Sequence, residues 1–472
     1  MIEIRIEGYA VDLTPDFSLV LERFNPLLDF NAFPSNRVYG FTLPITPRNR
    51  RILGYFEQPQ MGYTNRKFRC EKFVDGLLVE RGFVKFQDAK THEYNLYFSQ
   101  NLNEAFGDLQ QIPLSQIDLG SQAMPSSFSA VANPLTDPFC LPVIENAGFY
   151  GNQGVSGFGG RMNSYDTGTL TYAADARVPQ FFLRWVLQQY GLLTGWTFTG
   201  DFMNHPDLQR LLLYNLYSLD GATTIRYQNH LPELTMPQLL VSLRQLFNLF
   251  VEFDVPRKRC TISFGETVLA GGLVVDWTQK VASDFLKQPD LQSRPELSYD
   301  IDANDALMKP IPAVHDKYTT PETSSSEGGS LTPIRSRLST LPTNPVSGRA
   351  MTSQPGSSIH NKDNTNLPIP KLLFWNGLVA GEPRATCAQG GYSLTWHGAN
   401  NLLDTSFQRF EQFKRDTFLL KKNVFLTPAD LARFSFQQRV HIQGVHYLVG
   451  SLKMKLGSKA GVIPGEVDLW RV

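Results

Sequence analysis

The chain has few cysteines, few charges and no long apolar run. Its four cysteines, at positions 70, 140, 260 and 387, are widely spaced and form no CxxC pair. This pattern predicts reduced, mostly buried thiols in a protein made in a cytoplasm. The start, MIEIRIEGYAVDL, has neither a basic nor an apolar leader region, so no signal peptide is expected. No apolar run has the length that a membrane-spanning helix needs.

Charge is also low: 19% of the residues are Asp, Glu, Lys or Arg, and 44 basic residues balance 44 acidic ones. A net charge near zero argues against a general nucleic-acid binder or a surface that attracts polyanions. The 33 phenylalanines are more than a typical chain of this length contains. Few charges and many aromatics suit a surface covered by partners. A β-rich protein with large cores explains the same composition equally well.

Two motifs suggest catalysis or metal binding, and each has a simpler interpretation. Asp166-Thr167-Gly168 matches the aspartic-protease tripeptide, but no second copy exists and no apolar strand precedes it, so a turn is favoured. His441 and His446 flank a turn at Gln443-Gly444, and without carboxylates or thiols they indicate metal only weakly. The full set of eight histidines contains no HExxH pattern: His92, His205, His230, His315, His360, His397, His441 and His446.

The remaining polar motifs point no more clearly to chemistry. Residues 154–160 hold four glycines but lack the Lys-Ser/Thr of a phosphate loop, which favours a flexible loop. Asp201, Asp207 and Asp220 lack the paired spacing of glycoside hydrolases. The basic turn 257–259 is typical of a solvated hairpin tip. We therefore expect no enzyme, and we assign no catalytic, cofactor-binding or metal-binding residue.

The stretch 231–264 (LPELTMPQLLVSLRQLFNLFVEFDVPRKRCTISF) is the most clearly patterned unit. Thr235 and Gln238 have the spacing of a capping box, and Pro237 falls in the first turn of the helix. The apolar residues then recur at helical spacing: Leu239, Leu240, Leu243, Leu246, Phe247 and Phe250. From Val251 the period falls to two, which predicts a helix that leads into a hairpin.

Both ends of the chain are predicted to be β-rich. Near the start, strand patterns at 2–6, 17–24, 67–74 and 77–86 include Asp75-Gly76, the signal of a type I′ hairpin. Near the end, 404–416 is predicted to be helical, Thr427-Pro428-Ala429-Asp430 begins a second capped helix, and strands follow it. Between the ends, a helix is expected from Val178 to Gly191 or Gly195, and another over 206–219.

Residues 317–366 differ from the rest because Ser, Thr, Pro, Gly and Asn dominate them. Such a composition buries too little apolar surface to offset its ordering entropy. We therefore expect this segment to be ordered only by neighbouring molecules.

At 472 residues the chain should divide into about two to four domains. The predicted fold class is α+β, mainly β, with two tube-like β-barrel modules at the ends of the chain and mixed helix–hairpin domains between them. The expected boundaries are an N-terminal barrel at 1–110, a loop-rich interaction segment at 111–177, a helix–hairpin domain at 178–265, a C-terminal barrel at 266–316 with 367–472, and the insertion at 317–366.

Several stretches share their order with a known family. They are 11–28 (VDLTPDFSLVLERFNPLL) with 41–56 (FTLPITPRNRRILGYF), 139–151 (FCLPVIENAGFYG) with 160–165 (GRMNSY), 178–215, 231–254 and 426–455. Together they resemble the tail-tip or baseplate hub proteins of tailed bacteriophages, particularly those of Bacteroidetes phages and prophages. They span most of the chain and omit the Ser/Thr-rich segment.

The resemblance implies a structural virion protein without a cofactor. It implies a homotrimer in which each chain supplies two tube-like barrels, so that three chains mimic a six-fold ring. Such a ring would cap the tail tube or meet a distal tail protein, hold the central spike or fibre, and contact the tape-measure protein. It would sit at the tail tip after assembly in the host bacterial cytoplasm, with neither a membrane anchor nor a sequence-specific nucleic-acid partner.

Two other functions remain open at this point. One is a hexameric distal tail adaptor protein, and the other is a cell-surface carbohydrate-binding or hydrolytic β-protein. The two terminal β modules favour the hub over the adaptor. The missing signal peptide and the missing acid pair count against the cell-surface protein. The symmetry of the assembly would separate these alternatives.

Overall fold

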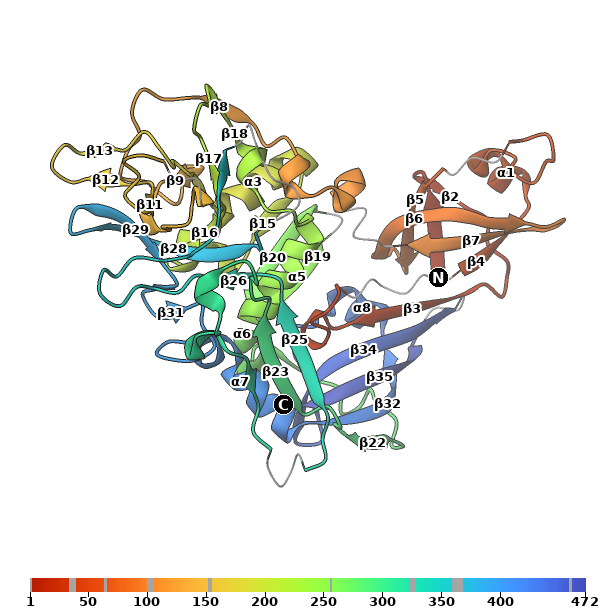
Figure 1. Cartoon of the computed structure of the whole chain (residues 1–472). Coiled ribbons are helices and arrows are strands. Elements are labelled where there is room, and N and C mark those ends of the chain that lie inside the picture. Colours follow the sequence, from red (N-terminus) through yellow and green to blue (C-terminus); the bar gives the residue numbers. More distant parts are fainter. Residues whose placement is uncertain are drawn as a thin grey trace.

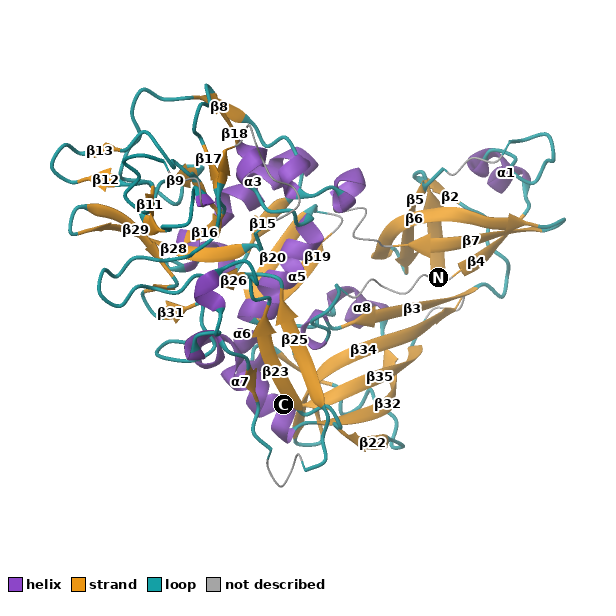
Figure 2. Cartoon of the chain, in the orientation of Figure 1, coloured by secondary structure: helices purple, strands orange, loops and turns teal. Residues whose placement is uncertain are grey.

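The computed structural model describes residues 2–33, 40–62, 66–99, 106–151, 155–254, 257–322, 327–358, 368–457 and 461–472. Strands dominate and short helices lie among them, which confirms a mainly β, α+β chain (Figures 1 and 2). Within the described residues, no helix combines the length and the apolar character needed to cross a bilayer.

The first module is a six-stranded sheet with the order β2-β1-β5-β6-β7-β4. The type I′ signal at Asp75-Gly76 is confirmed, because both residues have positive φ between β5 and β6. β4 ends at Pro44 on the edge of the sheet, where the missing N–H of proline costs no ladder hydrogen bond. The elements are β1 (Ile2–Ile6), β2 (Tyr9–Ala10), β4 (Gly40–Pro44), α1 (Pro47–Leu53), β5 (Phe68–Val74), β6 (Leu77–Ala89) and β7 (Glu93–Ser99).

The module formed by the end of the chain is a seven-stranded sheet that contains one strand from the start of the chain. Its path is β21-β33-β34-β35-β32-β22, and β3 pairs with β34 from Ser18↔Gly457 to Phe24↔Ser451. The prediction that the strand at 17–24 belongs to an N-terminal barrel is therefore wrong. The strands are β3 (Ser18–Phe24), β21 (Val274–Asp276), β22 (Leu286–Pro289), β32 (Phe418–Leu426), β33 (Arg439–Ile442), β34 (Val445–Gly457) and β35 (Ile463–Arg471).

The predicted capped helix and hairpin at this end of the chain are present. Thr427 and Asp430 form a capping box at the start of α8 (Pro428–Arg433). Gln443 and Gly444 have positive φ at the turn between β33 and β34. The predicted helix at 404–416 is found as a π-helical turn (Leu403–Phe407) followed by α7 (Gln408–Asp416).

A central sheet collects strands from four distant parts of the chain in the order β26-β28-β16-β14-β9, with β29 paired to β28. The helix expected over 206–219 is wrong. Its run Leu211-Leu212-Leu213-Tyr214 is buried at every residue, which suits a fully buried strand rather than one face of a helix. The strands are β9 (Phe139–Cys140), β14 (Gln180–Phe182), β16 (Leu211–Tyr214), β26 (Ser339–Thr340), β28 (Lys371–Val379) and β29 (Glu382–Thr386).

The helix–hairpin unit is present as the sequence predicts. α5 (Met236–Phe247) leads through Asn248 into β19 (Leu249–Asp254) and β20 (Arg259–Phe264). The capping box is formed, with Gln238 N–H donating to Thr235 Oγ1 at 3.4 Å and Thr235 N–H donating to Gln238 Oε1 at 3.0 Å. Around the unit lie α3 (Leu183–Thr194), β15 (Thr197–Thr199), α4 (Asp201–Asn204) and α6 (Gly265–Ala270).

The Ser/Thr-rich segment is more ordered than its composition predicts. Within 327–358, Ile334, Leu338 and Leu341 are buried in the core of this chain. The expectation that only neighbouring molecules order the segment is therefore wrong for these residues, while 323–326 and 359–366 lie outside the described residues. A small sheet forms here from β23 (Arg294–Tyr299), β24 (Tyr318–Thr319) and β25 (Leu331–Ser336).

The remaining strands form short pairs around the central sheet. The loop-rich segment 111–177 supplies several of them, and it packs Ile144, Phe149 and Met162 into a second hydrophobic core. The pairs are β8 (Ser121–Ala123) with β18 (Thr224–Arg226), β10 (Ile144–Glu145) with β11 (Arg161–Met162), β12 (Tyr165–Asp166) with β13 (Thr171–Tyr172), β17 (Tyr217–Ser218) with β27 (Ser357–Ser358), and β30 (Ala388–Gln389) with β31 (Tyr392–Ser393).

A core position and the N-cap of α5 give a quantitative test. Leu243 is fully buried, so Leu243→Ala should lower the free energy of unfolding by about 2–5 kcal/mol through the cavity it leaves. Thr235 is partly exposed, so Thr235→Ala should cost only about 1 kcal/mol through the lost cap. Urea unfolding followed by circular dichroism measures both. An equal or reversed order would show that the helix face is not a packed core.

Candidate functional site

The motifs that suggested chemistry lie apart, and their contacts are structural. Asp166 is in the tight turn between β12 and β13, where its Oδ1 accepts the N–H of Gly168 at 2.8 Å. That hydrogen bond is the largest cause of a lowered pKa at this exposed carboxyl. The side chain therefore closes a turn, as the turn interpretation requires.

The histidine pair lies on one hairpin. His441 and His446 are register partners on β33 and β34, with ring centroids 5.2 Å apart. Across the described ranges, no group of three or more His, Cys, Asp or Glu side chains could hold a metal ion. In the basic turn, Arg257 and Arg259 both pair with Asp254, at 3.0 and 3.5 Å. The glycine-rich loop cannot be placed completely, because Gly154 lies outside the described residues.

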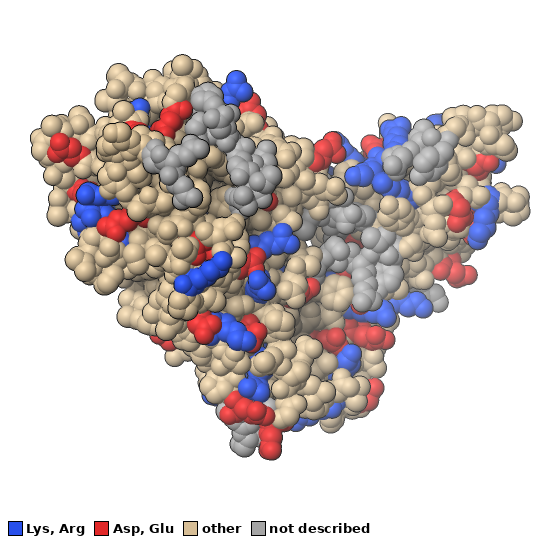
Figure 3. Space-filling view, in the orientation of Figure 1, with Lys and Arg blue, Asp and Glu red and all other residues tan. Residues whose placement is uncertain are grey.

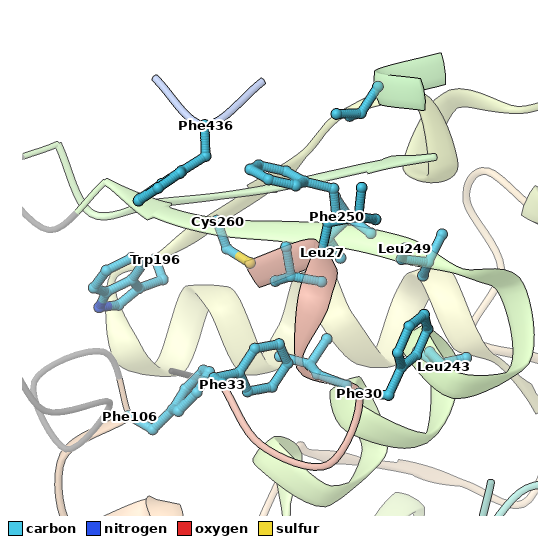
Figure 4. Close-up of a cluster of buried hydrophobic side chains, with 14 of the residues drawn as sticks. Leu27, Phe30, Phe33, Phe106, Trp196, Leu243, Leu249, Phe250, Cys260 and Phe436 are labelled. Carbon is cyan, nitrogen blue, oxygen red and sulfur yellow. The ribbon is translucent and has the colours of Figure 1, made fainter. Parts of the chain in front are cut away.

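Residues 18–33, which we call the N-terminal strap, contact several modules of the chain. Its first part is β3, paired along its whole length with β34. Its second part is the short 3₁₀ turn η1 (Pro26–Leu28), followed by Phe30 and Phe33. In Figure 4, Leu27, Phe30 and Phe33 point into the cluster formed by the helix–hairpin unit. The strap therefore joins β34 of the C-terminal sheet to the helix–hairpin unit.

Asn25 fixes the bend between the two parts of the strap. Its Nδ2 donates to the carbonyl of Val449 at 2.8 Å, and its N–H donates to the carbonyl of Gly450 at 2.8 Å. Its Oδ1 accepts the N–H of Leu27 at 2.9 Å, which caps η1. A Cβ on Gly450 would meet the Trp470 ring at 2.5 Å, so a side chain at 450 would displace the strap or the ring.

Arg244 of α5 holds the second part of the strap. Although this arginine lies in the last turn of α5, its side chain is fully buried and donates to the carbonyl of Ala32 at 3.1 Å. Its guanidinium faces the rings of Phe30 at 5.4 Å and Phe33 at 5.8 Å. Burial lowers the pKa of Arg244 to about 10, and nearby Asp29 opposes that shift. Two aromatic faces and a carbonyl thus hold a cation in an apolar core.

Arg23 connects the strap to the first module. Its Nη2 donates to the carbonyl of Val79 in β6 at 2.6 Å, and its Nη1 reaches the carbonyl of Leu431 in α8 at 3.4 Å. Burial lowers the pKa of Arg23, and Glu80 and Glu252 oppose that shift. One side chain therefore bonds to backbone from both terminal modules.

A separate buried polar network lies beside the central sheet. Lys371, the first residue of β28, donates from Nζ to Asp302 Oδ2 at 2.9 Å, and both side chains are almost fully buried. Gln354 bonds to both partners, with Nε2 on Asp302 at 2.7 Å and Oε1 on Lys371 at 3.2 Å. Burial raises the pKa of Asp302, but Lys371 and the hydrogen bonds outweigh it and the net pKa is lowered. Burial lowers the pKa of Lys371 against the opposing effect of Asp302.

Sequence reasoning missed Arg23, Arg244 and the Lys371 network for different reasons. Arg244 lies on a helix whose apolar face the sequence predicts. A periodicity pattern does not show that a long polar side chain on that helix is buried in the core. Asp302 and Lys371 are 69 positions apart, so no local spacing joins them. Asn25 and Pro26 are the local sequence signal for the bend of the strap.

The visible surface does not suggest a charged ligand. In Figure 3, acidic and basic side chains are intermixed over the face shown, without a broad area of one sign. A shallow depression of about 470 Å³ on the C-terminal sheet has the same mixed character, since Lys421 and Lys453 pair with Asp468 and Glu466 across its floor. This arrangement favours protein contacts over polyanion binding.

The role assigned to Arg23 can be measured. Arg23→Met keeps the apolar stem but removes both hydrogen bonds, and it should lower the free energy of unfolding by about 1.5–3 kcal/mol. Amide exchange should accelerate in β6 and α8 around the two carbonyls. The matched control is Arg5→Met, because Arg5 is exposed and its contacts with Glu3 and the Phe73 ring lie at the surface, so its cost should stay below about 1 kcal/mol. Equal effects of the two changes would contradict the bridging role.

A buried histidine predicts a pH dependence of stability. His315 shares a 2.7 Å hydrogen bond with the hydroxyl of Tyr299, and burial lowers its pKa from 6.5 to about 4. The unfolded chain therefore binds this proton first, and the contribution to stability is lost as pH falls from 6.5 towards 4. The full loss is about 3 kcal/mol.

Urea unfolding between pH 7 and pH 4 measures this contribution of His315. His315→Gln should flatten that part of the profile relative to the unchanged chain. An identical slope in the variant would show that the histidine is not buried in its neutral form.

Comparison with known proteins finds only distant alignments to solved structures. No family model matches the chain, and no curated protein matches it. Among solved structures, the 43 kDa tail protein of prophage MuSo2 from Shewanella oneidensis aligns at 10% identity and a TM-score of 0.38, covering 99% of this chain and 97% of that one. The tail protein from Neisseria meningitidis MC58 aligns at 10% identity and a TM-score of 0.39, covering 99% and 95%. Prophage tail protein gp18 from Listeria monocytogenes EGD-e aligns at 8% identity and a TM-score of 0.39, covering 99% and 94%. Since each TM-score is below 0.5, these alignments carry no argument about function.

Proposed function

We propose that this chain is a structural hub of a bacteriophage tail tip or baseplate. It would cap the tail tube, hold the central spike or fibre, and assemble as a homotrimer. The proposal gives the chain no catalytic step, and its partners would be the tail tube or distal tail protein and the tape-measure protein. The basis for the family is the sequence resemblance, and the structure adds one observation to it.

That observation is where the resembling stretches lie in the fold. Residues 11–28 include β3 and η1 of the strap, and 426–455 include most of β34, its pairing partner. Residues 231–254 include α5 and β19, whose side chains enclose Phe30 and Phe33 of the strap. Three stretches that are distant in sequence therefore meet at one junction. This convergence supports a shared assembly architecture rather than a set of unrelated similarities.

The same junction suggests how the hub would work. A tube-like arrangement needs the two terminal β modules held at a fixed angle, because a ring closes only when the rotation between neighbouring modules is constant. β3 and Arg23 attach the first sheet to the last, so one chain presents both sheets as a single unit. Three copies would then present six β modules to a six-fold tube. Closure of either sheet into a barrel is part of this proposal.

The distal tail adaptor is the second candidate, because it would use the same β modules in a ring of six chains. The intermixed charge and the balance of 44 basic and 44 acidic residues are compatible with either ring. The two terminal sheets of each chain favour the trimer, since three chains already supply six modules.

The oligomeric state tests the proposal. Native mass spectrometry of the purified full chain should give a complex of three times 53.2 kDa, and averaged electron micrographs should show three-fold symmetry with a pseudo-six-fold rim. A complex of six chains would support the distal adaptor instead. A stable monomer over the micromolar range, or glycan hydrolysis or binding by the monomer, would contradict the hub.

A further inference from the structure

We propose that the amine of Lys371 and the carboxyl of Asp302 condense into an intramolecular isopeptide bond. This inference rests on the buried network beside β28 and does not depend on the proposed function. The bond would join the two ends of the segment between positions 302 and 371, which contains the Ser/Thr-rich residues.

The first support is the geometry of the two reacting groups. Nζ of Lys371 lies 2.9 Å from Oδ2 of Asp302, with side-chain exposures of 0% and 2%. The carbon that would be attacked, Cγ, is one bond beyond that oxygen. Lys371 is held at the start of a central strand, paired with Tyr214 on one side and Ser339 on the other. A fixed amine beside a fixed carboxyl has the high effective concentration that intramolecular condensation requires.

The second support is the set of donors on the carboxyl group. Oδ2 accepts the N–H of Ile369 at 3.0 Å and the side-chain amide of Gln354 at 2.7 Å. Oδ1 accepts the N–H of Asn304 at 3.0 Å. The Asn304 N–H is placed to stabilise the negative charge that develops on Oδ1 when the carbon becomes tetrahedral.

The third support is that the site is apolar and excludes water. The ring of Tyr214 faces Nζ at 5.6 Å, and the surrounding core includes Leu212, Leu216 and Leu373. Asp305 is fully buried and accepts the hydroxyl of Thr352 at 2.7 Å; that hydroxyl also lies 3.4 Å from Gln354. The apolar wall disfavours two separated charges and so favours proton transfer within the pair, whereas the carboxylate of Asp305 opposes it by raising the pKa of Lys371.

The reaction balances without another reagent. The ammonium of Lys371 gives one proton to Oδ2 of Asp302, which leaves a neutral amine and a carboxylic acid. Nζ then attacks Cγ, and the N–C bond forms. A second proton passes from nitrogen to Oδ2, the Cγ–Oδ2 bond breaks, and one water leaves. No atom is oxidised or reduced, and exclusion of bulk water opposes the reverse hydrolysis.

The expected consequence is mechanical. Positions 302 and 371 are 69 residues apart, so the bond would convert the intervening segment into a closed loop anchored on the central sheet. Tension along the chain would then pass across the amide and would not unravel the strands within that loop. Such a link suits a protein that must keep its shape under load.

Intact mass under denaturing conditions tests the proposal on the unchanged full chain. The measured mass should be lower than the sequence mass by one water, and a tryptic digest should contain a branched peptide that joins Lys371 to Asp302. Asp302→Asn should lose one ammonia instead, because the amide then supplies the leaving group. Lys371→Arg should restore the full sequence mass.

The chain contains its own control in the ion pair Lys72–Glu80. That pair is 2.7 Å apart and almost equally buried. The Phe98 ring lies only 3.2 Å from the Lys72 ammonium, and so close a cation–π contact stabilises the charged, unreactive form of the amine. Its peptides should remain unlinked in the same digest. A full sequence mass for the unchanged chain, with residues 302 and 371 recovered in separate linear peptides, would overturn the proposal and leave the network as an ion pair only.

Discussion

The pairing of β3 with β34 is the constraint on which the arrangement of the modules depends. Seven consecutive residues near the start of the chain complete a sheet built otherwise from its last two hundred residues. Such a pairing between distant segments carries a loop-closure cost that its contacts must offset. This pairing fixes the position of both ends of β3. It therefore sets where the chain passes to the first module and where η1 packs against the helix–hairpin unit. The strap is therefore a structural element of the whole chain and does not belong to one domain.

Buried cations mark the places where this arrangement is most specific. Arg23, Arg244, Lys72 and Lys371 are each removed from water to a large extent, and each has a defined set of acceptors or aromatic faces. A buried charge adds little net stability, since desolvation offsets much of the attraction. It penalises alternative arrangements strongly, because a displaced acceptor leaves the charge unpaired. At Arg23 and Arg244 the penalised alternatives are other positions of the strap, which explains how a short segment holds one geometry.

The sequence predicts local elements well and their partners poorly. The capping boxes at Thr235 and Thr427, the turns at Asp75-Gly76 and Gln443-Gly444, and the strand patterns of β1, β5 and β6 all follow from rules that act over a few residues. The strand at 17–24 was recognised as a strand but assigned to the wrong sheet, because alternation identifies its faces and not its neighbour. The helix predicted over 206–219 is wrong because a continuous apolar run suits a buried strand and a buried helix alike. Within the junction, Asn25 and Arg244 could not be predicted, since their partners lie hundreds of residues away.

The aromatic content of the chain is explained largely by its cores. Many aromatic rings are packed inside this chain, as at Phe30 against Phe410 and Phe33 against Phe253, so large cores account for aromatics that a partner-covered surface would also explain. The case for assembly therefore cannot rest on the phenylalanine content. The proposal of an assembly rests on the sequence resemblance and on the strap, which holds the two terminal sheets together. Joining the first sheet to the last through a long-range pairing and a buried arginine restricts their relative rotation, and a fixed rotation is the property that a closed ring of β modules requires.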